Sequence, residues 1–318
     1  MKKTAKHFIM GIAAALGFAL VAAAPAEAAL NWTTTSTQNG VTCTVSGGET
    51  TYPGNGHIYY CDSQVNDRTA VYSKLNLDTT LVRTTLDNAN VRIYVWHNWT
   101  AYKQYFNVTG PVVAGASDSE VYGFTKPIGT VRNVHVIRYQ GSPPLEVSVT
   151  ANLLGVMMHE VGHQLDVLQL PPAGNLYNSQ LNANSIYYQK LMKDKAKINT
   201  YIPCNSLFRY DYYVDTSGNS QPVCPSGALN TALQGKTNWE IMTLAFPYVM
   251  TPGTNGSGIT YYGELYADMV SAVTSNGADP VFANYLRNDA FACSRNYVNG
   301  MRNNGVPPAN TSYQSWCN

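Results

Sequence analysis

Residues 153–168 read LLGVMMHEVGHQLDVL. The apolar side chains of this stretch recur at helical spacing, and the same spacing continues upstream to Leu145. The pattern therefore predicts one long, substantially buried helix from about Leu145 to Leu168. Pro143-Pro144 and Pro171-Pro172 flank the run, and proline is poorly tolerated inside a helix. We expect this helix to pack beneath the predicted sheet.

Residues 159–163 of this helix form the pattern H-E-x-x-H. Two histidines four positions apart lie one turn apart on the same helix face, so His159 and His163 can bind the same cation. Glu160 stands beside that face, where its carboxylate can accept a proton from a metal-bound water. The spacing predicts one catalytic Zn²⁺ ion bound by His159 and His163, with Glu160 as the general base.

The third metal ligand must come from elsewhere, because catalytic zinc takes three protein ligands and keeps one position open. A second helix is predicted from about Tyr261 to Thr274, and it carries Glu264 with Asp268 one turn further on. In such a pair one carboxylate can bind the metal while the other holds a ligand histidine through its free N–H. We expect Glu264 to be the third ligand. Other acidic candidates remain open at this stage: Glu240, Asp211 and Asp215.

Segments upstream of the first helix alternate in type. The predicted elements are strands at Val91–Trp96, Val121–Thr125 and Val134–Tyr139 and a short helix at Thr100–Phe106. This order predicts an α+β fold, with a twisted mixed sheet over the helix and a mainly helical C-terminal part that includes a helix from about Ser185 to Tyr201. The predicted division is a β-rich region at 29–85 and a catalytic domain at 86–318.

The first 28 residues resemble an export signal. Lys2, Lys3 and Lys6 precede an apolar run, and Ala26 and Ala28 provide a small-residue cleavage site. Removing this segment leaves 17 basic and 18 acidic side chains, since three lysines and one glutamate leave with it. A nearly neutral chain provides no basic surface for nucleic acid, and no later stretch is long and apolar enough for a membrane span.

All six cysteines lie after the predicted signal. An even number of cysteines in an exported chain favours disulfides, and we expect nearest neighbours to pair because each pair brackets one short segment. A zinc site built from these thiolates is the competing interpretation, but no C-x-x-C spacing occurs. The expected pairs are Cys43–Cys61, Cys204–Cys224 and Cys293–Cys317. The chain is accordingly expected to be secreted, either to the cell exterior or to a periplasm.

The residues around the two motifs resemble a known group of enzymes. The metzincin pattern would need Gly at 166 and His or Asp at 169, where this chain has Asp166 and Gln169. Residues 159–166, HEVGHQLD, and residues 264–268, ELYAD, instead resemble the gluzincin metallopeptidases, most of all the group of the anthrax lethal factor catalytic domain. That group combines H-E-x-G-H-x-x-D with a later E-x-x-x-[ED] helix. Here a cysteine-containing insertion lengthens the chain between the two motifs.

The resemblance implies a zincin-like fold and hydrolysis of peptide bonds in a protein or peptide substrate. It also implies a hydrogen-bond donor for the oxyanion, and the candidates are Tyr248, Tyr261 and Tyr262. The strand at Val121–Thr125 becomes the expected edge on which an extended substrate pairs, above His159. Asp166 lies too far along the helix to share the metal and is expected to anchor a neighbouring loop.

We therefore expect a secreted zinc metalloendopeptidase. The alternative is an exported adhesin or binding module that holds the metal in a closed, purely structural site. Three further histidines, His57, His97 and His135, are expected to have no part in the site, and Ile241-Met242 is expected to be a core pair.

Overall fold

The computed structural model describes residues 34–45, 58–61, 71, 79–128, 131–140, 145–146, 153–169, 176–208, 211–274, 277, 280–287, 289–309 and 315–317. The predicted signal segment and His57 lie outside these residues. The main helices are α2 (Thr80–Asn88), α3 (Trp99–Phe106), α4 (Leu154–Leu168), α5 (Ile186–Ile198), α6 (Asn238–Ala245), α7 (Pro247–Met250), α8 (Gly263–Thr274), α9 (Pro280–Arg287) and α10 (Ala292–Asn304).

The central element is a six-stranded mixed sheet with the order β1-β2-β3-β4-β6-β5. Strands β3, β4 and β6 are parallel, whereas the β1–β2, β2–β3 and β5–β6 pairs are antiparallel. Their bounds are β1 (Thr34–Gln38), β2 (Val41–Val45), β3 (Ile58–Cys61), β4 (Val91–Trp96), β5 (Gly123–Ile128) and β6 (Val131–Ile137). The α+β class and the mixed sheet are confirmed. The strands of the predicted N-terminal region belong to this same sheet.

The strand predicted at Val91–Trp96 has those bounds, and the short helix α3 begins one residue before its predicted start at Thr100. The strand predicted from Val121 begins at Gly123. The β1–β2 hairpin turns at Asn39-Gly40, where both residues have positive φ values of 50° and 79°. That conformation is the one a two-residue hairpin turn requires.

The predicted start of the helix that carries the H-E-x-x-H pattern is wrong. Leu145–Glu146 forms the short strand β8, which pairs with β7 (Tyr139–Gln140), and α4 begins at Leu154. The apolar residues at 145, 147 and 149 also recur with the period of a strand, so their spacing alone did not distinguish the two structures. Residues 147–152 lie outside the described part of the chain.

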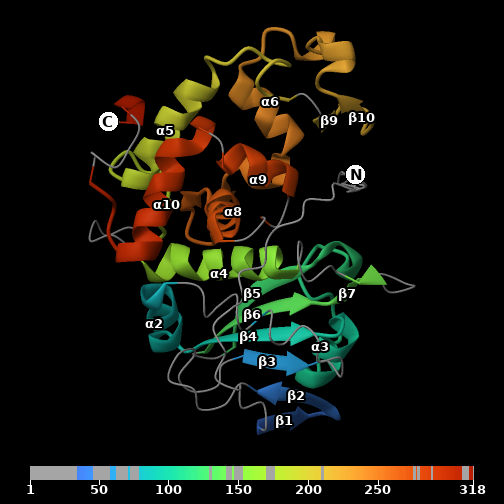
Figure 1. Ribbon diagram of the computed structural model, residues 1–318. Helices are drawn as coiled ribbons and strands as arrows, with labels where there is room; N and C mark the ends of the chain where they lie inside the picture. Colours follow the sequence, from blue (N-terminus) through green and yellow to red (C-terminus); the bar gives the residue numbers. More distant parts are fainter. Residues whose placement is uncertain are drawn as a thin grey trace, which may run out of the picture.

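Helix α4 lies between the sheet and the helical C-terminal part, as Figure 1 shows. Its apolar side chains, including Met157, Val161 and Leu165, are fully buried in the larger hydrophobic core. A second, aromatic cluster that includes Trp96 and Tyr102 lies between the sheet and α3. Contact with both halves of the molecule therefore fixes α4.

The three predicted disulfides are confirmed: Cys43–Cys61, Cys204–Cys224 and Cys293–Cys317. The first joins neighbouring strands β2 and β3. The predicted helices at 185–201 and 261–274 correspond to α5 and α8. Within the described residues, none of the helices combines the length and apolarity needed to cross a bilayer.

Candidate metal site

Helix α4 presents His159 and His163 on one face, with their ring centroids 4.8 Å apart. Both imidazoles border the packing interface between α4 and α8. His159 is 7% exposed and Glu160 is 6% exposed, so these polar side chains lie in a largely desolvated place. Buried polar groups need partners, and here the partners come from α8.

A close approach between α4 and α8 brings those partners within reach. A Cβ atom added to Gly162 would lie 2.7 Å from Cα of Ala267 and 3.0 Å from its carbonyl oxygen. Only glycine fits at that separation. Two turns earlier on α4, the carbonyl oxygen of Gly155 accepts a 2.7 Å hydrogen bond from Oγ of Ser271. The two helices are thus locked together along their length.

Glu264, in the first turn of α8, completes a cluster with the two histidines. Its Oε2 atom lies 3.1 Å from Nε2 of His159 and 3.5 Å from Nε2 of His163. One ligand atom from each residue lies within 4.8 Å of the other two, so the three residues could hold a metal ion. The structure brings together the three ligands expected from the sequence.

The spacing of these atoms fits zinc. Zinc binds nitrogen and oxygen ligands at about 2.0–2.2 Å, so two ligands of a tetrahedral site lie roughly 3.3–3.5 Å apart. The measured separations of 3.1 and 3.5 Å fall close to that range. Two imidazoles and one carboxylate are also a donor set that zinc accepts in catalytic sites.

Asp268 orients the first histidine. Its Oδ1 accepts a 2.7 Å hydrogen bond from Nδ1 of His159, which leaves Nε2 directed at Glu264 and His163. A carboxylate on the outer nitrogen fixes the ring and raises the basicity of the inner nitrogen. The second carboxylate of α8 therefore has the role that its spacing from Glu264 predicted.

The charges of the cluster stabilise one another. Burial alone would lower the pKa of His159, but contacts with Asp268 and Glu264 raise it well above its ordinary value. Burial would raise the pKa of Glu264, but hydrogen bonds to His159 and His163 hold it well below its ordinary value. Glu264 is consequently an anion, which is the form that binds a metal.

Glu160 lies beneath the edge strand β5. A Cβ atom added to Gly123, the first residue of β5, would lie 2.9 Å from Cγ and 3.1 Å from Oε1 of Glu160. Burial raises the pKa of Glu160, and the nearby His163 and His159 offset part of this shift. Residues 123 and 160 meet through the packing of β5 on α4, so their contact cannot be predicted from spacing along the chain.

Tyr248, on α7, also reaches the cluster. Although the residue is 69% exposed, burial of its hydroxyl end and the nearby carboxylates of Glu264 and Glu160 raise its pKa well above the ordinary value. The other two tyrosine candidates have different partners. Tyr261 stacks on Tyr177 with a 4.4 Å centroid distance, and Tyr262 is buried.

The rival acidic residues are engaged elsewhere. Glu240 caps its own helix α6 by accepting from N and Oγ1 of Thr237 at 2.7 and 2.9 Å. Asp211 accepts from the hydroxyl of Tyr285, and Asp215 accepts from backbone N–H groups of its own turn. Met242 is a buried core residue.

His135 is likewise buried away from the cluster, where it accepts from Nε1 of Trp96 at 3.1 Å. Burial lowers the pKa of His135 to about 3. A neutral imidazole among aromatic rings matches the ordinary strand residue that was expected.

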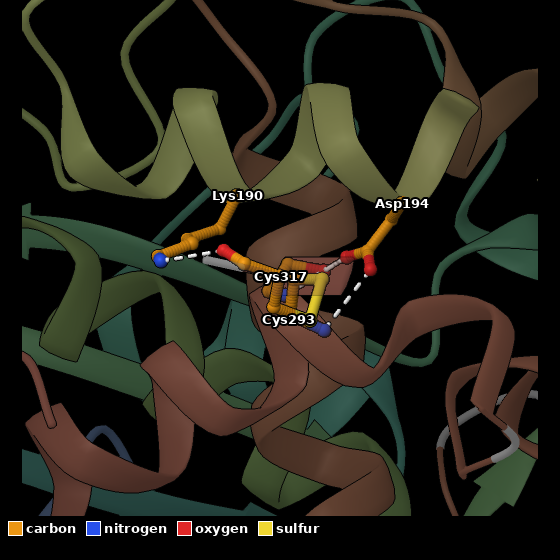
Figure 2. The surroundings of a disulfide bond; sticks show 5 residues. Lys190, Asp194, Cys293 and Cys317 are labelled. Carbon is orange, nitrogen blue, oxygen red and sulfur yellow. Dashed lines mark hydrogen bonds between the residues drawn. A yellow bond between two sulfur atoms is a disulfide. The ribbon is translucent and has the colours of Figure 1, made fainter. Parts of the chain in front are cut away.

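A second group, made of Asp194, Cys293 and Cys317, has the spacing of a metal site but not the ligand chemistry. Figure 2 shows the Asp194 carboxylate facing the disulfide that joins the two cysteines. Sulfur atoms in a disulfide are not thiolates and do not ligate zinc. The same picture shows Nζ of Lys190 donating to the carbonyl oxygen of Cys317 at 2.9 Å.

No protein-family model, no curated protein and no solved structure matches this chain. The function is therefore inferred from the chemistry of the His159, His163 and Glu264 cluster and its surroundings.

Proposed function

We propose that this protein is a secreted zinc-dependent metalloendopeptidase with a zincin-like fold. The observation that carries the proposal is the convergence of His159, His163 and Glu264 at zinc-ligand spacing, with the carboxylate of Glu160 beside them. The three disulfides support an oxidising compartment, either extracellular or periplasmic. The substrate would be a protein or peptide.

Zinc in this cluster would act as a Lewis acid that polarises the scissile carbonyl and acidifies the attacking water. His159, His163 and Glu264 would hold the ion, and Asp268 would keep His159 oriented. Glu160 would accept the proton of the water and pass it to the leaving amine. Its raised pKa supports the first of these transfers, because the protonated acid is then less costly to form.

Tyr248 is the favoured oxyanion donor of the three tyrosines. Its hydroxyl lies beside Glu264 and Glu160, and its raised pKa keeps the hydroxyl protonated as a donor. The exposure of the ring supports a position on the wall of the site that a substrate can reach.

The register of β5 supports substrate binding by strand addition. The N–H of Ile137 donates to the carbonyl oxygen of Tyr122 at 3.2 Å. Hydrogen-bonded pairs alternate along an antiparallel ladder, so the backbone groups of Gly123 and Thr125 point away from β6. Among the described strands β5 is the end of its sheet. An extended peptide could therefore pair there, directly above Glu160.

Proline at position 127 would limit that pairing. It is the next residue of β5 whose backbone faces outward, and proline has no N–H to donate. The proposed ladder therefore spans only Gly123 to Thr125. A short ladder favours recognition of a few extended residues around the cleaved bond over recognition of a long strand.

The test is a digest of denatured casein by the purified protein with and without zinc, together with a Glu160→Gln variant. We expect cleavage by the zinc-loaded protein, none after chelation, and none by Glu160→Gln although it retains bound zinc. Stoichiometric zinc without cleavage by the unaltered protein would favour the metal-binding module instead. Full activity of Glu160→Gln would contradict its assignment as general base.

A further inference from the structure

A buried polar network joins the C-terminal end of α4 to the chain that leads into α8. Asp166 is 2% exposed, and Asn178 and Ser179 are fully buried. The Asp166 carboxylate accepts from N of Ser179 at 2.8 Å and from Oγ of Ser179 at 2.6 Å. Its backbone carbonyl accepts from N of Asn178 at 2.9 Å. The expectation that Asp166 anchors a neighbouring loop is confirmed.

The anchored loop in turn holds the residues that precede the third ligand. The carbonyl oxygen of Ser179 accepts from N of Tyr262 at 2.9 Å, and N of Leu181 donates to the carbonyl oxygen of Thr260 at 2.8 Å. Between these contacts Gln180 bridges to Tyr261 as in an antiparallel sheet. Residues 179–181 therefore pair with β12 (Thr260–Tyr261) as a neighbouring strand would. Strand β12 ends two residues before α8.

Burial disfavours the charged form of the Asp166 carboxyl group. Burial raises the pKa of Asp166 to about 6, even though the hydrogen bonds from Ser179 favour its charged form. Ser179 gives both of its donors, the backbone N–H and the hydroxyl, to this one side chain. Two bonds to a single carboxylate fix the direction of the loop as well as its distance from α4.

We propose that Asp166 is a positioning residue for the third metal ligand. Through Ser179 and Tyr262 it sets where Glu264 lies relative to His159 and His163. This inference rests on the proposed metal function. It assigns Asp166 a role in metal affinity, whereas a purely structural anchor would contribute to stability alone.

Asp194 provides a matched control. It is also a buried aspartate, and it accepts from N and Oγ of Ser294 and from N of Cys293 at the start of α10. Its donors repeat the serine pair that binds Asp166. However, it fastens α5 to the start of α10, beside the disulfide that Figure 2 shows. Replacing either aspartate should destabilise the fold.

The experiment measures zinc affinity by competition with a chelating dye, and thermal stability in parallel. We expect Asp166→Asn to weaken zinc binding by about 10- to 100-fold, as is usual for residues that orient a metal ligand. Ser179→Ala, which removes only the hydroxyl, should weaken it in the same direction and keeps the test decisive if Asp166→Asn does not fold. Asp194→Asn should lower thermal stability and leave zinc affinity unchanged.

A Glu264→Ala background distinguishes a failure of the proposed metal site from a failure of the positioning role of Asp166. With the third ligand gone, adding Asp166→Asn should cause no further loss of zinc affinity, because the residue it positions is absent. Unchanged zinc affinity in both Asp166→Asn and Ser179→Ala, beside a clear loss in Glu264→Ala, would overturn the inference and leave the proposed site standing. Unchanged affinity in Glu264→Ala would overturn the proposed site, and the inference with it.

Discussion

Replacing Gly123 by alanine tests how closely the edge strand constrains the general base. The added methyl would lie 2.7 Å from Cγ1 of Val156, 2.9 Å from Cγ of Glu160 and 3.1 Å from its Oε1. Ordinary contact begins at 3.4 Å, so Glu160 must retreat by about 0.5 Å and Val156 by about 0.7 Å. A misplacement of about 1 Å in a catalytic group can cost roughly 100-fold in rate.

We therefore expect Gly123→Ala to lower kcat by about tenfold, which corresponds to about 1.4 kcal/mol of transition-state stabilisation. Zinc content should not change, because the three atoms nearest to the added methyl belong to Val156 and Glu160 and not to His159, His163 or Glu264. The assay is the cleavage rate of a quenched fluorescent peptide at saturating concentration. Zinc stoichiometry and the melting temperature are measured on the same samples.

Two further variants show whether the loss comes from Glu160. Gly110→Ala is the control substitution, since a Cβ atom there would have no neighbour within 4 Å. Val156→Ala in the Gly123→Ala protein removes the tighter contact but not the one with Glu160. It should restore thermal stability without restoring kcat. An unchanged kcat in Gly123→Ala, or full recovery of kcat when Val156→Ala is added, would show that β5 does not hold Glu160 in its catalytic position.

Three other predictions follow from the site and its surroundings. Glu264→Ala should lose most of its bound zinc, whereas Glu240→Ala should retain it because Glu240 only caps α6; equal zinc contents by metal analysis would contradict this. Tyr248→Phe should lower kcat by about 100-fold with zinc retained, the usual cost of one oxyanion donor, and an unchanged kcat would exclude the assignment. Burial raises the pKa of Asp194 from 3.8 to about 7, so the folded state binds this proton more tightly than the unfolded state. Its contribution to the free energy of unfolding is complete below about pH 4 and is lost as pH rises to about 7, by at most about 4 kcal/mol. Denaturant titrations at both pH values should show a smaller difference for Asp194→Asn than for the unaltered protein.

Much of the candidate site could be predicted because its residues are close together in the sequence. The helix repeat alone places His159 and His163 on one face with Glu160 beside it, and it places Asp268 one turn after Glu264 on α8. Nearest-neighbour pairing of the cysteines succeeded because each disulfide closes a short segment.

Other features depend on contacts across the fold, which spacing does not encode. The contact between Gly123 and Glu160 exists only because β5 packs on α4. Tyr248 is one of 23 tyrosines, and only the position of α7 beside α8 singles it out. The predicted start of α4 is too early because the apolar residues at 145, 147 and 149 fit the spacing of a strand as well as that of a helix.

The close approach at Gly162 constrains how this sequence can diverge. The two nearest atoms that a larger side chain would meet are the Cα and the carbonyl oxygen of Ala267, which every amino acid possesses. No compensating substitution at position 267 can make room, so the constraint falls on position 162. Descendants of this chain that keep α4 and α8 at this distance are expected to keep the glycine. Those that lose it must separate the two helices, and with them the two parts of the proposed metal site.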